Sequence, residues 1–445
     1  MKLTSAISNK YFATFCLLLG SIFFVSPAQA KVVTVGCAGA PGGPYNYKTL
    51  TAAIQANPAG NVEIDVSGTC TEAVVVAGAQ NLSIVGKSGA ALRDPGGSPP
   101  SFGAVLEIDN SQNVTVQGLL IGVASRTIAD AIPGILVQSS DVRIVQDRIE
   151  GAGPSDGIDM LQATVRLIGA TIIENNNDGQ GNGNGVALFG PGSQLLLLND
   201  FSGNCPVLQG NDTGILAGRG GTVVRAPFGR GCVTIQNNAF AAVIANLGAT
   251  IDLNVPHANP GTVKLLNNLF GLYAQNGSHF ILSGPVLIQG NSIDGIRLRT
   301  ASGALFPSDG ASGPTIQGNG SNLHPPCCAP SAGIAVANNG SLDIQAGLVT
   351  HNAAPGIIIE DNSSVRLVGP LSITRNPIGV QVTDVSSAAF FLAPSVSGNT
   401  RVDVACGPES VAHGDASAVG TSHCPQFRHH REFSADSTRH NKPMP

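Results

Sequence analysis

A segment of 23 residues occurs three times in succession near the C-terminal end of this chain. The three copies begin at Gly333, Gly356 and Gly379, and in each copy a β-branched or other small apolar residue follows the glycine within two positions. Each copy also ends near an asparagine, namely Asn352, Asn376 or Asn399. A fixed period of this length indicates structural units that stack, because one unit cannot bury its apolar side chains alone.

Within each copy the apolar residues alternate in the manner of a β-strand. In the second copy Ile357 and Ile359 point one way, while Ile358 and Glu360 point the other, and turn residues follow every five to eight positions. Three short strands and three turns therefore make one turn of a coil, which we call a rung. The pattern predicts an all-β fold, a single-stranded right-handed parallel β-helix (a solenoid) of about 12 rungs.

The same markers continue towards the N-terminus. The glycine that opens a rung recurs at Gly134, Gly157, Gly185, Gly214, Gly271 and Gly295, with Ala242 in the same place once. The asparagine recurs at Asn204, Asn238, Asn268, Asn291 and Asn319. Because stacked rungs place equivalent residues above one another, we expect these amides to form a hydrogen-bonded column and to occupy left-handed turns.

The N-terminal segment predicts export. Lys2 and Lys10 precede an apolar run that ends in Ala-Gln-Ala, so residues 1–30 are expected to be a signal peptide cleaved after Ala30. The alternative is a membrane anchor, but the run is shorter than the roughly 20 apolar residues of a spanning helix. No later stretch is long enough to span a bilayer. The predicted location is secreted or periplasmic.

The cysteines agree with an oxidising compartment. Cys16 leaves with the signal peptide, so eight cysteines remain, an even number. Proximity predicts three disulfides, which are Cys37–Cys70, Cys205–Cys232 and Cys406–Cys424. Cys327 and Cys328 are then joined to each other or paired elsewhere. A zinc site is the weaker interpretation, because no C-x-x-C accompanies them and His324 is the only imidazole nearby.

Charge argues against some partners. Loss of the signal peptide removes two lysines and changes the net charge from −5 to −7, which disfavours nucleic acid and anionic membranes. Residues 31–425 are expected to form the β-helix, and residues 426–445 a disordered basic tail. A metal-binding histidine tract is the alternative for the tail. We expect no cofactor and no metal site in the body of the chain.

A short amphipathic helix is predicted before the coil. Leu50, Ala53 and Ile54 lie on one helical face, and Asn57-Pro58 ends it. Such a helix would cover the edge of the first rung. The run YKTLTAAIQANPAG, followed by SGTCTEAVVV and LSIVG, resembles the N-terminal part of the pectin-lyase-like β-helix superfamily. The resemblance extends over residues 32–406 and implies the fold. It does not select a reaction, since the superfamily includes polysaccharide lyases, glycoside hydrolases, uronate epimerases, pectin esterases and many proteins of unknown activity.

One candidate site is a group of three carboxylates. In each opening strand the second and fourth residues after glycine face outward, which brings Asp159 to the surface near Asp156 and, one rung on, Asp178. The segment SDGID resembles the Asn-Thr-Asp-Gly-Ile-Asp segment of polygalacturonases, and the resemblance implies acids that flank a glycosidic bond. The chain lacks that family's Gly-Asp-Asp and Gly-His-Gly segments, and GIRLRT lies five rungs away. The alternative is a structural Asp-Gly turn.

A second candidate site combines an aromatic ring with cations. The outward columns place together Tyr273, Gln275, Arg297, Arg299 and, further along, Glu360. A ring that stacks on sugar and guanidinium groups that hold carboxylates would bind an acidic polysaccharide. In a lyase one arginine would neutralise the substrate carboxylate and another would abstract a proton. The alternative is a group of ordinary surface arginines.

The remainder of this face is apolar. The outward residues include Leu136, Leu161, Phe189, Leu216, Ile244 and Ile358. Monomers seldom expose a long apolar strip, so either the loop of residues 301–331 or a second copy of the chain is expected to cover it. Two functions follow from these patterns. One is binding, and hydrolysis or lyase cleavage, of an acidic polysaccharide, and the other is a non-catalytic structural or adhesive role in an extracellular assembly.

Overall fold

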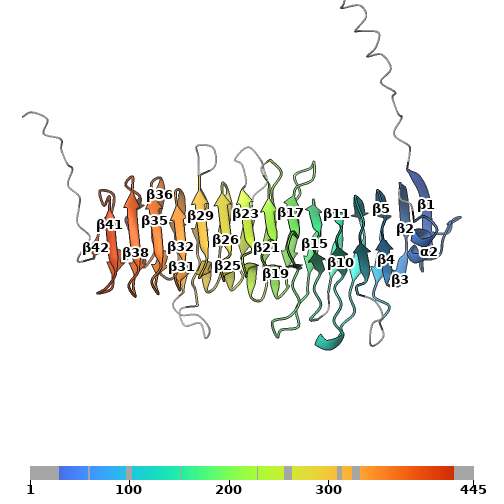
Figure 1. Cartoon of the computed structure of the whole chain (residues 1–445), viewed down its shortest axis with the longest axis horizontal. Helices are drawn as coiled ribbons and strands as arrows, with labels where there is room; N and C mark the ends of the chain where they lie inside the picture. The colour runs from blue at the N-terminus through green and yellow to red at the C-terminus, as the bar shows by residue number, and fades with distance from the viewer. Residues whose placement is uncertain are drawn as a thin grey trace, which may run out of the picture.

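The computed structural model describes residues 30–424 apart from 59–60, 97–102, 152, 228, 255–262, 308–312 and 323–330. The chain forms one elongated coil, with its N-terminal rungs at one end and its C-terminal rungs at the other (Figure 1). The predicted signal peptide apart from its last residue, the basic tail, and Cys327, Cys328 and His324 lie outside the described residues.

Three long parallel sheets run along the coil. Sheet A has 15 strands, sheet B has 13 and sheet C has 14, and within each sheet the hydrogen-bonded neighbour is in general three strands further along the chain. In sheet C, for example, β10 (Ile135–Gln138) pairs in parallel with β13 (Ile158–Leu161), which pairs in parallel with β16 (Val186–Phe189). One rung therefore contributes a strand to each sheet in turn, which confirms the predicted parallel β-helix.

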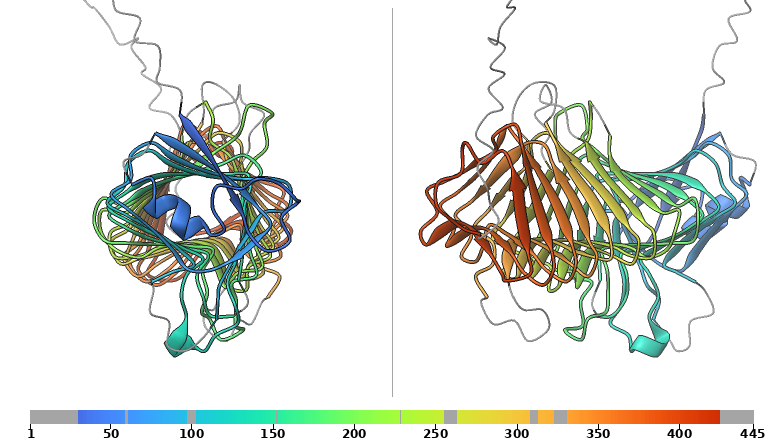
Figure 2. Two further views of the ribbon diagram at one scale, coloured as in Figure 1. Left: turned by 90° about the vertical axis from the view of Figure 1, so that its right-hand side faces the viewer. Right: turned by 60° about the vertical axis from the view of Figure 1, so that its left-hand side comes forward.

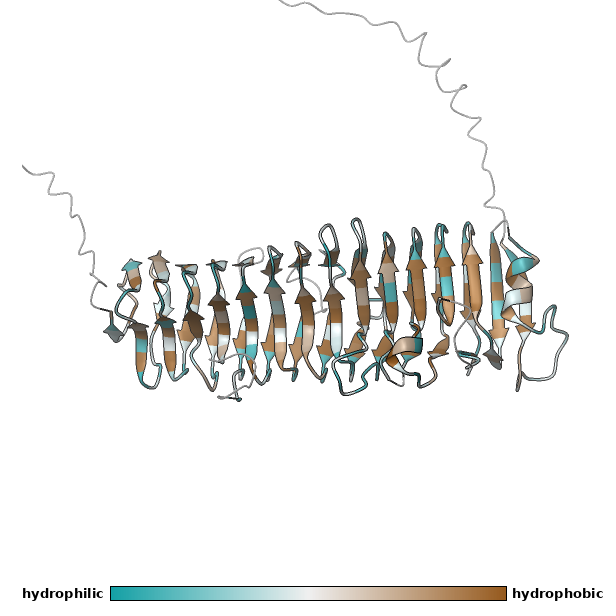
Figure 3. Cartoon of the chain, turned by 60° about the horizontal axis from the view of Figure 1, so that its bottom comes forward, coloured by the Kyte–Doolittle hydropathy of each residue, from teal (hydrophilic) through white to brown (hydrophobic). Residues whose placement is uncertain are grey.

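Alternating side chains fill the inside of the coil. Strand β2 (Val62–Ser67) buries Val62, Ile64 and Val66 and leaves the residues between them partly exposed. The same pattern recurs from rung to rung, so the strands are mainly hydrophobic and the turns mainly hydrophilic (Figure 3). Each aliphatic side chain removed from water stabilises the fold by about 2 kcal/mol before entropy is counted.

Asparagine amides form a continuous ladder at the corner between sheets B and C. Each side-chain nitrogen donates to the side-chain oxygen of the next asparagine at 2.8–3.1 Å. The members are Asn176, Asn211, Asn238, Asn268, Asn291, Asn319, Asn352, Asn376 and Asn399. Asp403 ends the ladder by accepting from the Asn399 amide at 2.8 Å.

Two details of the ladder differ from the prediction. Asn204 is not a member, because it lies in a loop between sheets A and B where its amide donates to Asp200; its rung contributes Asn211 instead. The left-handed residue is also not the ladder asparagine. It is the residue before each one, as at Gly210, Asn237 and Arg375, so the turn precedes the amide.

A short helix lies at the N-terminal end of the coil. Helix α2 (Leu50–Gln55) begins after Thr49, whose hydroxyl accepts from the Ala52 N–H at 3.2 Å. The side chain of Glu72 accepts from the Leu50 N–H at 2.7 Å, which ties the helix to the first rungs. The helix lies across the opening of the coil in the left view of Figure 2.

The three predicted disulfides are present, joining Cys37 to Cys70, Cys205 to Cys232 and Cys406 to Cys424. They fit an extracellular or periplasmic protein. Among the described residues, no helix has the length and hydrophobicity needed to cross a membrane.

Candidate functional site: a carboxylate cluster beside the asparagine ladder

The outward columns of sheet C have the predicted register. Asp159 lies beside Leu136 on one side and Ala187 on the other, and Tyr273 lies beside Arg297. The glycine spacing therefore placed the candidate residues correctly along the coil. Their surroundings decide what they can do.

The carboxylates gather where sheet B connects to sheet C. Asp156 lies in the loop before β13 and Asp159 on that strand, while Asp178 lies in the loop between β15 (Ile172–Glu174) and β16. Long loops of this connection, including the one with the short helix η1 (Ile128–Asp130), project from the same edge of the coil (Figure 1). Successive loops therefore form one continuous rim along several rungs.

Asp156 and Asp159 form a hydrogen-bonded carboxyl pair. Burial raises the pKa of both groups, and it raises the pKa of Asp159 to about 9, helped by the charge of Asp156. The carboxylate of Asp156 also accepts from the backbone N–H of Asn184 at 2.5 Å and from its amide at 3.0 Å. Oδ1 of Asp159 is buried and has no hydrogen-bond partner among the described residues. The pair therefore shares a proton at neutral pH.

Asp178 is in the opposite environment. It is half-buried, and hydrogen bonds from the Asn182 amide and the Gln180 N–H lower its pKa, so it stays ionised. Two carboxyl groups whose surroundings move their pKa values apart are the usual basis of acid and base roles at one site.

Asp212 is a fourth member that the sequence reasoning missed. It lies before β19 (Thr213–Ala217) and is buried; burial raises its pKa, and the charges of Asp178 and Asp156 raise it further. The sequence does contain a pattern that marks this acid. An aspartate stands one or two residues before the glycine that opens a rung in three rungs, at Asp156, Asp212 and Asp294. Aligning the rungs on glycine would have shown the repeated acid.

The second predicted cluster is largely internal. Tyr273 is 8% exposed and packs against Phe270 and Phe240, with ring centroids 5.2 and 6.4 Å away. Arg297 is 4% exposed, and its Nε donates to Asp294 Oδ2 at 2.5 Å. These two side chains are therefore occupied by contacts within the chain.

Gln275 and Arg299 are the members that reach the surface. They lie side by side on β25 (Phe270–Gln275) and β28 (Asp294–Arg299). With the Asn338 amide oriented so that its oxygen faces the guanidinium, Nε and Nη2 of Arg299 donate to it at 2.9 Å. Burial raises the pKa of nearby Glu360 to about 7, although the charge of Arg297 opposes this. The cations of this cluster, Arg297 and Arg299, therefore lie close to acids, including Glu360 and Asp361.

The apolar strip is exposed only in part. Ile358 is 1% exposed and packs with Ala332 and Ala335, whereas Leu161 is 41% exposed. Contacts within the chain therefore cover the C-terminal part of the strip. Nothing in the structure supports a homo-oligomer formed through it.

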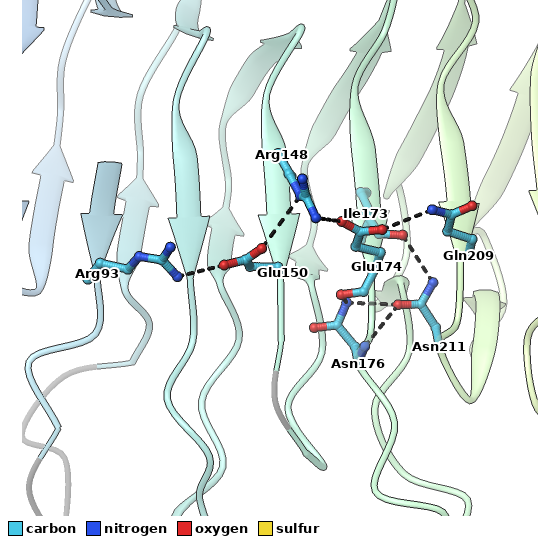
Figure 4. Close-up of polar contacts among 8 residues, drawn as sticks. All are labelled: Arg93, Arg148, Glu150, Ile173, Glu174, Asn176, Gln209 and Asn211. Carbon is cyan, nitrogen blue, oxygen red and sulfur yellow. Dashed lines mark hydrogen bonds and ion pairs between the residues drawn. The ribbon is translucent and has the colours of Figure 1, made fainter. Parts of the chain in front are cut away.

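The outer face of sheet B presents paired charges (Figure 4). Arg93 contacts Glu150 at 2.7 Å, and Arg148 contacts Glu174 at 2.5 Å. Gln209 donates to Glu174 at 2.9 Å and continues the row. On this face each arginine drawn is matched by an acid, so the row stabilises the stack and leaves little net charge for a ligand.

One group of possible metal ligands exists in the described part of the chain, consisting of Cys37, Cys70 and Glu72. Its two sulfurs form a disulfide, so they are not thiolate ligands. These three residues therefore do not fit a metal ion.

The three sheets and the asparagine ladder define the class of this protein, a parallel β-helix. No family model matches the chain, and no curated protein matches it.

The solved structures similar to it at low scores include the following two. The A-module of the mannuronan C-5 epimerase AlgE6 of Azotobacter vinelandii is 13% identical, with 86% of this chain and 89% of that one covered and a TM-score of 0.26. PfbA, a surface adhesin of Streptococcus pneumoniae, is 11% identical, with 81% and 87% covered and a TM-score of 0.28. Scores of this size carry no argument about function, and the assignment of the fold rests on the sheets themselves.

Proposed function

We propose that this chain is an exported β-helix that binds an acidic polysaccharide and cleaves its glycosidic bonds at the carboxylate cluster. The observation that carries the proposal is the Asp159 carboxyl, which is buried beside another acid and has an oxygen without a partner. This arrangement costs folding stability, and Asp159 belongs to neither the asparagine ladder nor the core. Groups held in this way concentrate at functional sites.

The roles follow from the two environments. Asp159, protonated at neutral pH, donates a proton to the leaving oxygen of the sugar, and ionised Asp178 activates a water molecule. Asp156 acts through its neighbours, because its carboxylate holds the Asn184 loop and shares a proton with Asp159. Export through residues 1–30 is part of the proposal, and the disulfides support it.

The test is a screen of the purified protein against uronate polymers and neutral glucans, measuring both reducing ends and unsaturated products. Reducing ends without unsaturation are expected, and Asp159→Asn is expected to lower the rate about 100-fold or more. Asp178→Asn, which removes the proposed base, is expected to lower the rate as well. Its matched control is Asp415→Asn, because Asp415 is another loop aspartate whose pKa is lowered by hydrogen bonds. Full activity in Asp159→Asn, or no product from any polymer, overturns the proposal.

A structural or adhesive role is the second candidate. It is favoured by the hydrogen bonds from Asn184 to Asp156, because these bonds hold two neighbouring loops together and so give Asp156 a structural role. In that case the same polymers bind without turnover, and Asp156→Asn loosens the loop of residues 175–185 towards proteases while binding is unchanged.

A further inference from the structure

A groove of about 520 Å³ lies on the outer face of sheet A, where the sheet meets the loops that lead to sheet B. Its floor is apolar, because Val145, Ile168 and Leu198 stand side by side on three neighbouring strands. These strands are β11 (Asp141–Val145), β14 (Thr164–Ile168) and β17 (Gln194–Leu198). None of these residues belongs to the carboxylate cluster.

Two arginines stand along one side of this floor. Arg143 and Arg166 are register partners on β11 and β14, so their backbones are about 4.8 Å apart. Arg166 forms an ion pair with Asp141. Arg143 is exposed, and it makes no hydrogen bond or ion pair with any other residue that the structure describes. One cation of the groove is therefore available to a ligand.

The opposite side is an aromatic ring supported by a third arginine. The Phe201 side chain is fully exposed, and the Arg230 guanidinium lies 5.3 Å from the centre of its ring. Nη2 of Arg230 donates to the backbone oxygen of Asn199 at 2.5 Å, which fixes the guanidinium. The adjacent acid, Asp200, accepts from the Ser202 and Asn204 N–H groups of its own loop at 2.9 Å.

We propose that this groove binds an acidic polysaccharide chain, with the sugar faces against Phe201 and the apolar floor and the sugar carboxylates on the arginines. Phe201 buries none of its apolar surface on folding and has only the Arg230 guanidinium over its ring, whereas an aromatic face is suited to the C–H face of a sugar. Guanidinium groups bind carboxylates in a bidentate manner. The groove thus adds the cationic binding surface that the carboxylate cluster lacks.

The charge of the whole molecule selects between polymers. The mature body is acidic, with a net charge of −7 once the two signal-peptide lysines are gone, and so repels densely charged nucleic acid. Three arginines face two acids here, Asp200 in the groove and the Asp141 that pairs with Arg166, so the groove keeps about one unmatched positive charge, on Arg143. A polymer with about one charge per sugar fits it better. The inference rests on the proposed function and adds a binding site for its polysaccharide, made of residues that the cleavage step does not use.

The experiment is equilibrium binding of the full chain to polygalacturonate, a sulfated glycan, dextran and single-stranded DNA. Binding to polygalacturonate is expected, with affinity that falls as salt is added. Arg143→Ala and Phe201→Ala are each expected to weaken it about tenfold, and both side chains are exposed, so the variants fold. The matched control is Arg366→Ala, because Arg366 lies over Phe391 at 5.0 Å elsewhere on sheet A.

Asp159→Asn separates this inference from the proposed function, because that variant loses cleavage and keeps binding if the groove is the binding site. Preference for the sulfated glycan assigns the groove to sulfate groups in place of carboxylates and overturns the uronate assignment. Equal binding to dextran, preference for DNA, unchanged binding in both groove variants, or no binding to any polymer also overturns it.

Discussion

Replacing one asparagine of the ladder tests how much the ladder contributes to the stability of the fold. The Asn291 side chain is fully buried and makes four hydrogen bonds. Its oxygen accepts from the backbone and side-chain N–H groups of Asn268, and its nitrogen donates to the Leu265 carbonyl and the Asn319 amide. Asn291→Ala leaves the Asn268 backbone N–H without its acceptor, which costs about 2 kcal/mol, and loss of the remaining bonds adds about 1 kcal/mol.

The loss should be local, because each rung contacts only its neighbours. Hydrogen exchange is the suitable assay. Amides of β24 (Val263–Leu266) and β27 (Val286–Gln289) should exchange about 100-fold faster in the variant, as about 3 kcal/mol implies, while those of β10 stay unchanged. The control is Asn246→Ala, which removes one exposed amide bond, to Asn276, and should change exchange by less than about fivefold. Equal effects of the two substitutions would refute the role assigned to the ladder.

Three further predictions concern packing and charge. Gly295→Ala should destabilise the fold by about 2 kcal/mol or more, because a Cβ would lie 2.6 Å from the Gly333 oxygen, whereas Gly42→Ala, in open space, should leave the denaturation midpoint unchanged. Asp159→Asn should raise the melting temperature at pH 8 and leave it unchanged at pH 3. The raised pKa of about 9 means that the folded state keeps a proton that the unfolded state releases near pH 4, so stability falls as pH rises between these values; parallel pH profiles for the two proteins would contradict this. Arg126→Met should lower the free energy of unfolding by about 3 kcal/mol, because it leaves the buried Asp94 carboxylate without its cation. In melting scans the double variant Arg126→Met, Asp94→Asn should regain part of that stability.

The coil could be predicted from the sequence because its period and its alternation are independent signals that agree. Glycine spacing sets the length of a rung, and alternation decides which residues face outward, so the columns through Asp159, Tyr273 and Arg297 have the predicted register. The disulfides followed from proximity once the stack was known.

Loops of variable length limited how much of the ladder, of the burial of side chains and of the groove could be predicted from the sequence. The rung that begins at Gly185 carries both Asn204 and Asn211, and an insertion before Cys205 displaced the asparagine that the spacing selected. The burial of Tyr273 depends on Phe240, which enters from the preceding rung outside the strand pattern. The arginine groove lies on sheet A, where the turns before the strands differ in length and composition: Ser139 and Ser140 precede β11, whereas four residues, Gly190 to Ser193, precede β17. The glycines that open the sheet C strands therefore do not set the outward columns of sheet A.

The placement of the disulfides has a consequence for survival outside a cell. A molecule built in one dimension begins to unravel where a unit has a single neighbour, at its tips. Cys37–Cys70 closes the first turns, and Cys406–Cys424 closes the last. Within the residues that the structure describes, both end turns of the coil are therefore held by a disulfide, and a protease is expected to cut a projecting loop in the interior first. Reduction of these disulfides should increase the rate of proteolysis, with the first cuts in the turns at the two ends of the coil.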